Sequence, residues 1–256
     1  MTEFGSLIRE DLTDSGGASN LKFNEKIKAL QRAGQNVVHF GFGQSPFPVP
    51  DPFVRRLRET AAENAYLPVA GLPELREQIV QFHLEWDGVE LGAEQLVVGP
   101  GSKELIFLTL AVFRGTVWLA APAWTTYSPQ CRLAGHSPLL VNQTAAAGWK
   151  LEPGVLEAAV AGRAGPQLLI LTSPGNPSGA AYTQSELAAL AAVCRRHSVI
   201  VLSDEIYARL EYSGSHTCMA QLYTEGTILT TGFSKWASAG GWRLGYAHFP
   251  PGLGLD

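Results

Sequence analysis

The sequence predicts an α/β protein with a mostly parallel central sheet and helices on both faces, a three-layer αβα arrangement. Its apolar runs are short and continuous instead of alternating with polar residues, which is typical of strands covered on both faces. Segments with helical periodicity separate these runs along the chain. Polar and Gly-rich motifs directly follow several of the runs. Together these patterns indicate successive strand–helix units built around one sheet.

The first part of the chain predicts an arm, a helix and an extended crossing segment. A polar, Gly-rich stretch at Ser15-Gly-Gly-Ala-Ser-Asn20 is expected to form a mobile arm. Residues 22–33 predict a helix that Gly34 stops. Residues 41–50 are rich in proline, which cannot donate to a strand ladder and resists helix, so an extended segment is expected there.

Helices and strands alternate through the rest of the chain. Helices are expected at residues 52–62 and 74–86, with a turn at Gly71-Leu-Pro73 between them. Strands are expected at residues 95–98, 116–120, 167–171, 199–202 and 228–231. A helix over residues 102–113 separates the first two strands. Thr183-Gln-Ser-Glu186 has the form of a capping box and predicts another helix before the fourth strand.

Composition narrows the classes of function. The net charge is −4 at pH 7 with acids and bases interspersed, so neither nucleic acid nor a membrane is an expected partner. Three scattered cysteines, Cys131, Cys194 and Cys218, do not make a disulfide framework, which favours a reducing compartment. The N-terminus lacks the basic and apolar regions of a signal peptide. These observations favour a cytoplasmic protein.

Chemically useful side chains follow five of the predicted strands, at the point where each strand ends. They are Ser102, Trp124 with Tyr127, Asn176, Asp204 and Lys235. In open α/β sheets, ligands bind beyond the carboxyl ends of the strands. We therefore expect these loops to converge on one rim and to form one site.

Lys235 lies in Gly232-Phe-Ser-Lys-Trp236, and Arg243 follows in Gly241-Trp-Arg-Leu-Gly-Tyr246. A free lysine, with a pKa of about 10.4, is a poor nucleophile at neutral pH. A neighbouring cation or desolvation frees the amine to form a Schiff base, and Arg243 could supply that cation. The alternative is a solvated loop lysine, since buried lysines are rare.

The run Ser203-Asp-Glu-Ile-Tyr207 places two acids and a phenol after a strand. Asp204 could pair with a protonated pyridine nitrogen and keep that ring an electron sink. The alternative is helix capping by Ser203 or Asp204, which would leave Glu205 the more exposed of the two acids. Tyr207 could hydrogen-bond a cofactor oxygen, or it could be a half-buried aromatic.

Three further motifs offer an amide, an anion site and an aromatic face. Asn176 lies in Ser173-Pro-Gly-Asn-Pro-Ser-Gly179, a rigid turn that aims its amide outward, with a plain turn asparagine as the alternative. Gly99-Pro-Gly-Ser-Lys103 opens a helix, so backbone N–H groups, the helix dipole and the Ser102 hydroxyl could bind an anion or merely cap the helix. Lys103 is a rival Schiff-base lysine, but the first helical turn suits phosphate contact better. Trp124 could stack on a ring or pack in the core.

An amine, a carboxylate, an amide, a phenol and a guanidinium are the groups that hold and tune pyridoxal phosphate. Other constellations do not assemble from this sequence. The Gly-Lys-Ser/Thr ending of a P-loop and the Gly-x-Ser-x-Gly elbow are absent. Cys194-x-x-His197 has no second pair that would complete a zinc site. The sequence therefore predicts pyridoxal phosphate and no metal.

These motifs, in this order, resemble the class I/II aminotransferases of the pyridoxal-phosphate fold-type-I superfamily, the aspartate-aminotransferase-like proteins. The resemblance extends from Gly43 to Tyr246. Its most specific parts are residues 173–179, residues 204–207, Ser234-Lys235 and Gly241-Trp-Arg-Leu-Gly-Tyr246. Tyr66 with Gly71-Leu-Pro-Glu-Leu-Arg76 is a further match. The fold implied is the large domain of these transferases.

The resemblance implies a role for each matching residue. Lys235 would form the Schiff base and shuttle the proton, with Asp204 on the pyridine nitrogen and Asn176 and Tyr207 on the ring oxygen. Ser102, Lys103, Ser234 and Arg243 would surround the phosphate. Trp124 would stack on the ring, and Gly43, Trp124 and Asn176 would meet the substrate. Tyr66 would reach the phosphate of a partner subunit, which implies a homodimer with composite sites.

The resemblance also implies a domain division. Residues 1–45 would form an N-terminal arm and part of a small domain, and residues 46–256 an incomplete cofactor-binding large domain. Members of this family continue beyond the Gly-Trp-Arg-x-Gly-Tyr strand into a small C-terminal domain, which carries the arginine that clamps the substrate α-carboxylate. No residue of this sequence matches that arginine, and Gln44-Ser-Pro-Phe47 departs from the Glu-Pro-Asp-Phe of relatives.

The activity implied is transfer of an amino group between an amino acid and a 2-oxo acid. Shared cofactor motifs leave two alternatives open, since a fold does not set a function. One is another fold-type-I enzyme, such as a carbon–sulfur lyase or a cyclopropane-carboxylate synthase. The other is a truncated homologue that binds the cofactor without catalysis.

Overall fold

A seven-stranded sheet with the strand order β1-β7-β6-β5-β4-β2-β3 forms the centre of the computed structural model. The structure describes residues 9, 19–39, 41, 43–214 and 216–253. The strands are β1 (Leu96–Gly99), β2 (Thr116–Ala121), β3 (Leu139–Asn142), β4 (Gln167–Thr172), β5 (Val199–Asp204), β6 (Thr227–Gly232) and β7 (Gly245–His248). Of these strands, β7 alone runs in the opposite direction to all the others. The predicted mostly parallel sheet is confirmed.

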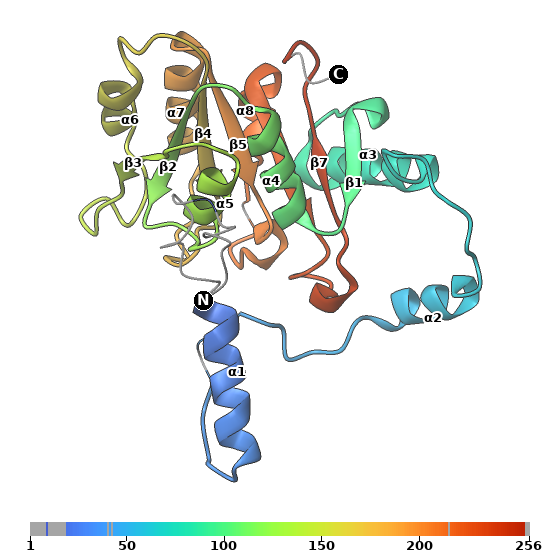
Figure 1. Cartoon of the computed structure of the whole chain (residues 1–256). Helices are drawn as coiled ribbons and strands as arrows, with labels where there is room; N and C mark the ends of the chain where they lie inside the picture. The colour runs from blue at the N-terminus through green and yellow to red at the C-terminus, as the bar shows by residue number, and fades with distance from the viewer. Residues whose placement is uncertain (1–8, 10–18, 40, 42, 215, 254–256) are drawn as a thin grey trace, which may run out of the picture.

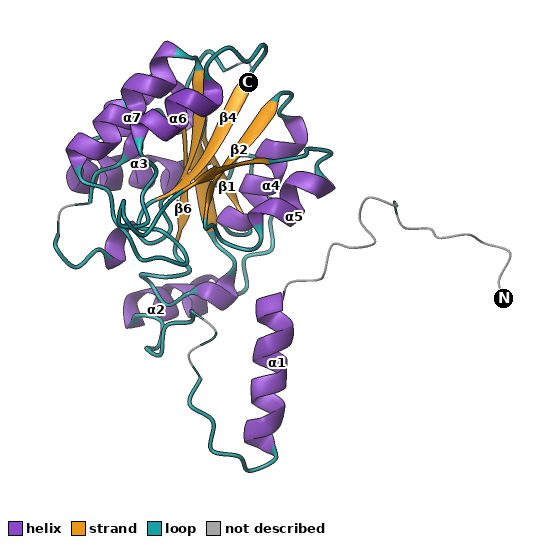
Figure 2. Cartoon of the chain, turned by 90° about the vertical axis from the view of Figure 1, so that its left-hand side faces the viewer, coloured by secondary structure: helices purple, strands orange, loops and turns teal. Residues whose placement is uncertain are grey.

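Helices cover both faces of this sheet (Figures 1 and 2). They are α1 (Ser19–Arg32), α2 (Asp51–Thr60), α3 (Pro73–Asp87), α4 (Ser102–Val112), α5 (Tyr127–Leu133), α6 (Pro153–Val160), α7 (Gln184–Arg196) and α8 (Met219–Leu222). Figure 2 shows α4 and α5 on one side of the sheet and α3, α6 and α7 on the other. The predicted three-layer arrangement is therefore confirmed.

The core consists of two apolar layers, one on each face of the sheet. Leu169, Leu190 and Val201 belong to the layer under α6 and α7. Leu110 and Leu168 belong to the layer under α4 and α5. Neighbouring residues of β4 thus enter opposite layers, and both layers are apolar, which explains why the strand sequences do not alternate. Burial of this apolar surface, at about 25 cal/mol per Å², is the main stabilising contribution to the fold.

Local sequence signals set several helix ends. Thr183 caps α7 by accepting a hydrogen bond from the Glu186 backbone, while the Glu186 carboxylate accepts one from the Thr183 backbone. The predicted capping box is confirmed. The helix α3 begins at Pro73 and ends before Gly88, whose φ of 61° is in the left-handed region that glycine tolerates.

Several short elements were not predicted from the sequence, among them β3, α5, α6 and α8. The strand β3 has four residues and lies at the edge of the sheet, where half of its pattern is exposed. The helices α5 and α6 have seven and eight residues. Such lengths span about two helical turns, too few for a periodic pattern to be distinguished from a loop.

The elements before α3 lie outside the three layers. Figure 1 shows α1 and α2 apart from the sheet. The helix predicted at residues 22–33 is found as α1, and the described residues of 41–50 contain no helix or strand, as predicted. The arm predicted around Ser15–Asn20 falls largely outside the described residues. In the described part of the chain, no helix combines the length and apolarity needed to cross a membrane.

Strand direction brings the predicted motifs to one rim. The strands β2, β4, β5 and β6 are parallel, and β1 points the same way because β7 lies reversed between β1 and β6. The loops that follow β1, β2, β4, β5 and β6 therefore all leave the sheet at the same edge. The expected convergence of these loops is confirmed.

Candidate active site

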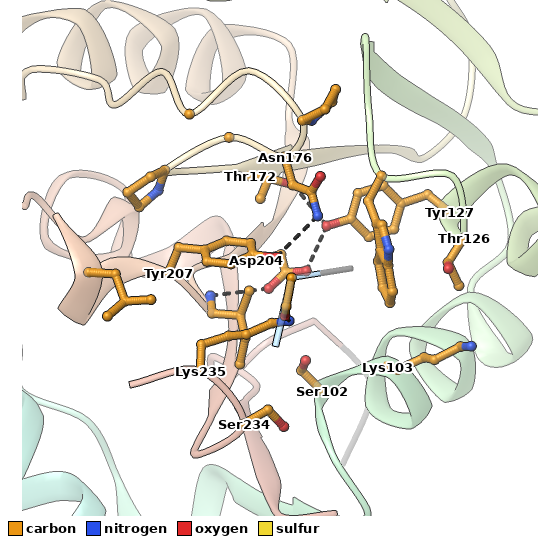
Figure 3. Close-up of a pocket in the computed structure, with 18 of the residues that line it drawn as sticks. Ser102, Lys103, Thr126, Tyr127, Thr172, Asn176, Asp204, Tyr207, Ser234 and Lys235 are labelled. Atoms are coloured by element: carbon orange, nitrogen blue, oxygen red, sulfur yellow. Dashed lines mark hydrogen bonds between the residues drawn. The ribbon is translucent and has the colours of Figure 1, made fainter. Parts of the chain in front are cut away.

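A cavity of about 1040 Å³ opens at this rim, walled by the loops after those five strands (Figure 3). The sequence-predicted residues that line it are Gly43, Ser102, Lys103, Trp124, Asn176, Asp204, Tyr207, Ser234, Lys235 and Arg243. Tyr66 is fully exposed and does not line this cavity. The structure thus brings together all the predicted site residues except Tyr66.

Asp204 ends β5 and forms the buried floor of the cavity, with 2% of its surface exposed. The Tyr127 hydroxyl donates to its Oδ2 at 2.6 Å, and the Ile206 backbone donates to its Oδ1 at 3.3 Å. Burial raises the pKa of this carboxyl to about 6, against the opposing effect of those two hydrogen bonds. No ion pair involves Asp204 among the described residues. The carboxylate is therefore placed to gain from a cationic ligand.

Tyr127 is a site residue that the sequence placed at the rim, after β2, but to which it assigned no role. It is the first residue of α5 and is 1% exposed. Its hydroxyl also shares a hydrogen bond of 2.8 Å with Thr172 Oγ1, so the phenol bridges β4 and Asp204. Burial, reinforced by the charge of Asp204, raises the pKa of Tyr127 well above its ordinary value. The one sequence signal was its position in the loop after β2, three residues beyond Trp124.

An amide and a phenol face the same cavity from neighbouring loops. Asn176 Nδ2 donates to the Tyr207 hydroxyl at 3.1 Å. Asn176 follows β4, and Tyr207 follows β5 (Figure 3). Burial and the charge of Asp204 raise the pKa of Tyr207, so this phenol stays protonated at neutral pH. The two side chains can both contact one ligand oxygen.

Lys235 presents its amine to the cavity from the loop between β6 and β7. Its Nζ donates to the Gly43 carbonyl at 2.7 Å and lies 5.5 Å from the centre of the Tyr207 ring. Burial lowers the pKa of Lys235, Asp204 opposes this effect, and Arg243 adds to the lowering. Desolvation therefore contributes more than the guanidinium that the sequence suggested. The result is an amine that loses its proton more readily than a surface lysine.

The other end of the cavity combines a helix N-terminus with a guanidinium, groups that suit an anion. Ser102 begins α4, and its backbone lies against the chain at Gly245, where a Cβ would come within 2.4 Å of Ser102 N. Gly101 has a φ of 95°, and a Cβ there would meet Arg243 Nη2 at 2.3 Å. These two glycines let the guanidinium and the helix N-terminus approach closely. Arg243 donates to the Pro100 and Gly240 carbonyls, and no ion pair of Arg243 is found in the described part of the chain.

Lys103 and Trp124 lie together beside this anion-binding end. Both are half-buried, and Lys103 Nζ lies 5.9 Å from the centre of the Trp124 ring. Figure 3 shows the Lys103 side chain directed away from Asp204 and Lys235. Trp124 contacts the Tyr127 ring edge-to-face at 5.4 Å and lines the cavity, so it is available for stacking. A phosphate contact by Lys103 stays a prediction.

The helix-capping alternative expected Glu205 to be more exposed than Asp204, but the structure buries both acids almost equally. Glu205 is 3% exposed and accepts hydrogen bonds from Ser203 Oγ, His216 Nε2 and the Met219 backbone. No α-helix begins at Asp204, and its bond to the Ile206 N–H is a local turn contact. The two neighbouring acids therefore face opposite sides of the chain.

The chain belongs to the aminotransferase class I and II family, whose pattern matches residues 35–251. It is 34% identical over 244 residues to an aspartate aminotransferase of Geobacillus stearothermophilus, covering 91% of this chain and 61% of that protein. It is 30% identical to an asparagine–oxo-acid transaminase of Streptococcus mutans, covering 90% of this chain and 61% of that protein.

Solved structures agree with this assignment. The aspartate aminotransferase of Thermus thermophilus with maleate superposes with a TM-score of 0.90 at 29% identity, covering 96% of this chain and 65% of that one. An aspartate aminotransferase from Rhizobium meliloti superposes with a TM-score of 0.87. The chain thus spans about three fifths of the length of the curated relatives it matches.

Pyridoxal phosphate is the cofactor of this family, and the described side chains fit it. A buried carboxylate without a cationic partner suits a protonated ring nitrogen. The amide and phenol pair suits a ring oxygen, and the amine of Lys235 suits an aldehyde. The N-terminus of α4 with Ser234 and Arg243 suits a phosphate. Each chemical group of the cofactor therefore has a complementary group in one cavity.

Proposed function

We propose that this chain binds pyridoxal phosphate through Lys235 and transfers an amino group between an amino acid and a 2-oxo acid. The observation that carries the proposal is that a buried carboxylate, which forms no ion pair among the described residues, and a partly buried amine line the same cavity. Asp204 and Lys235 supply these groups, and an anion-binding helix N-terminus lies at the other end. Its relatives named as aspartate aminotransferases support the same activity.

Different residues would hold different parts of the cofactor. Asp204 would hold the ring nitrogen, Asn176 and Tyr207 the ring oxygen, and Trp124 the ring face. Ser102, Lys103, Ser234 and Arg243 would surround the phosphate. When bound, pyridoxal phosphate supplies an electron sink for the bond that breaks at the substrate α-carbon. Tyr127 acts behind Asp204 by donating to its carboxylate and keeping it ionised.

Lys235 is the group that we assign to proton transfer. Burial lowers the pKa of this amine, so it gives up its proton more readily than a surface lysine and can accept and return one during turnover. The Gly43 carbonyl holds this amine in the cavity through the 2.7 Å hydrogen bond. Gly43, Trp124 and Asn176 are the residues that we expect to contact the substrate.

Further parts of the proposal concern assembly and organisation. We infer a homodimer in which Tyr66 enters the site of a partner subunit. The support is that Tyr66 and Val69 are fully exposed and Leu67 is 60% exposed, an unusual display of large side chains on one segment. Residues 46–256 would form the cofactor-binding domain, with residues 1–45 as an arm. The three cysteines, all free and buried, support work in the reducing cytoplasm, in amino acid metabolism.

Borohydride trapping tests the cofactor assignment. Adding pyridoxal phosphate to the purified chain should give a visible absorption band, and reduction followed by peptide mapping should place the label on Lys235. Lys235→Ala should abolish the label, whereas Lys103→Ala should keep it. A label on Lys103, or an unchanged label in Lys235→Ala, would overturn the assignment.

Product analysis tests the reaction type. Amino-group transfer requires a 2-oxo acid acceptor and yields a new amino acid. A carbon–sulfur lyase instead releases ammonia and a 2-oxo acid without an acceptor. Acceptor-independent ammonia release would therefore replace the proposed reaction with the lyase alternative.

A further inference from the structure

The chain from Glu205 to Leu210 forms a wall between two cavities. Asp204, Tyr207 and Leu210 line the main cavity. On the other side, Glu205, Ala208 and Arg209 line a second cavity of only about 10 Å³. Figure 3 shows Asp204 and Tyr207 on the side of the active site. Side chains of one short segment therefore alternate between the site and a buried region behind it.

Behind the wall, a chain of polar contacts leads from Arg209 to β7. Arg209 Nη2 donates to both carboxylate oxygens of Asp87 at 2.5 Å. Asp87 Oδ2 is 2.6 Å from His83 Nδ1, and His83 Nε2 is 2.9 Å from the Tyr246 hydroxyl. The side chains of Asp87 and His83 are 1% and 3% exposed. We call Arg209, Asp87, His83 and Tyr246 the rear network.

The charged groups of the rear network stabilise one another. Burial alone would raise the pKa of Asp87, but His83 and Arg209 outweigh it and lower the pKa below its ordinary value. The Arg209 guanidinium also lies 5.0 Å from the centre of the Phe82 ring, which fixes the plane of the side chain. Arg209 is thus held by a carboxylate and by an aromatic face, both on α3.

Tyr207 lies between two fixed points of the wall. At one end, Glu205 is held by Ser203, His216 and the Met219 backbone, and its own carbonyl accepts from Thr231 Oγ1 at 3.1 Å. At the other end, Arg209 is held by Asp87. The Leu210 backbone donates to the Tyr207 carbonyl at 2.8 Å and closes the turn that joins Tyr207 to Arg209.

Stability alone is a weak reason for such a network. Buried ion pairs contribute little net stability, because desolvation of both charges offsets their attraction. What they supply is a fixed geometry, since a fully hydrogen-bonded charged network has few alternative arrangements. The part of the active site next to this network is Tyr207, which must present its hydroxyl to Asn176 and to the cofactor.

We propose that Arg209 and Asp87 are positioning residues that act on the active site through Tyr207. The inference rests on the proposed function for its effect on the cofactor, but its structural claim concerns the cofactor-free chain. Neither side chain lines the main cavity, so neither touches the ligand itself. Their effect must therefore pass through the wall.

Arg209→Met tests the proposal beside Arg195→Met, a control that loses the same kinds of contact at an exposed position. Arg195 also pairs with a carboxylate, that of Glu225 at 2.6 Å, and lies 5.0 Å from an aromatic ring, that of Tyr223. It is remote from the cavity lining. We expect Arg209→Met to weaken pyridoxal phosphate binding by about tenfold, a typical effect of losing a supporting contact. The visible band of the bound cofactor should also shift its pH midpoint, and Arg195→Met should change neither.

A double variant shows whether the effect passes through Tyr207. In a Tyr207→Phe background, Arg209→Met should have little further effect on affinity or on the pH midpoint, because the hydroxyl that it positions is already gone. An additive loss would overturn the proposal. Arg209→Lys, which keeps the charge, and Asp87→Asn serve if Arg209→Met does not fold. Both should show intermediate losses with the same dependence on Tyr207.

A crystal structure of the cofactor-free Arg209→Met chain separates this inference from the proposed function. We expect Tyr207 to leave hydrogen-bond distance of Asn176, which is 3.1 Å in the unaltered chain. If that hydrogen bond is kept, Arg209 does not position Tyr207 and the proposal fails. This result is independent of cofactor binding. Failure of the unaltered chain to bind pyridoxal phosphate would instead count against the proposed function.

Discussion

Replacing Asp204 with Asn is expected to make the cofactor-free chain more stable at neutral pH while damaging its cofactor site. The buried carboxyl has its pKa raised from 3.8 to about 6. A pKa difference of one corresponds to about 1.36 kcal/mol, so the ionised form destabilises the fold by about 3 kcal/mol at neutral pH. Asn has the same shape and carries no charge, so the variant avoids this penalty.

The sign of the pH dependence follows from the direction of the shift. The pKa of Asp204 is raised in the folded state. The stability that depends on the protonated Asp204 carboxyl is therefore fully present below about pH 4, and it is lost as the pH rises through about 6. The neutral carboxyl and the amide each offer one acceptor to Tyr127 and Ile206, so the two chains should have similar free energies of unfolding near pH 4. The advantage of Asp204→Asn should then grow and level off above pH 6.

Urea unfolding of both cofactor-free chains, followed from about pH 4 to about pH 8, measures this difference. Subtracting the two free energies of unfolding removes the titration of all other groups. A difference that does not change with pH would refute the reasoning, since burial would then impose no penalty on the Asp204 carboxylate. Adding pyridoxal phosphate should stabilise the unaltered chain more than the variant, because a ligand that binds the folded state more tightly stabilises it more.

Three further substitutions probe other contacts of the site. Tyr127→Phe removes the donor to Asp204, so the pKa of Asp204 should rise further and cofactor affinity should fall by about tenfold in a titration. Burial works to lower the pKa of His216, but its carboxylate partner outweighs this and raises it. His216→Gln should therefore reduce the free energy of unfolding most below about pH 6.5 and least at alkaline pH, where the unaltered chain has also lost the ion pair. Gly245→Ala should place a Cβ 2.4 Å from Ser102 N and destabilise the chain by about 1–3 kcal/mol in urea unfolding, with a matching loss of inorganic phosphate binding.

The convergence of the site could be predicted because strand direction dictates it. Asn176, Asp204 and Lys235 each follow a short apolar run, and parallel strands release their loops at one edge. The reversed β7 agrees with this reasoning, since it begins at the same rim beside the end of β6, and Arg243 precedes it by two residues. Local chemistry was therefore enough to place these residues together.

Contacts between distant parts of the chain could not be predicted in this way. Tyr127 and Asp204 are 77 residues apart in sequence, and Asp87 and Arg209 are 122 residues apart. Neither pair has a local signature, because each depends on how α5 and α3 pack on the sheet. Nothing in the sequence indicated that Glu205 is as buried as Asp204. Its burial follows from His216 and the Met219 backbone, which the chain brings back against β5.

The position of β7 in the sheet affects the order in which parts of the cavity can form during synthesis. It is the last strand along the chain but lies second in the sheet, between β1 and β6. At about 5–20 residues per second, a ribosome needs roughly 7 to 30 s to pass from β1 to β7. During that interval β1 lacks its partner strand β7, and the N-terminus of α4 lacks its contacts with Arg243 and Gly245. The anion-binding end of the cavity is thus expected to form late in the folding of a nascent chain, after the parallel strands β2, β4, β5 and β6 have assembled.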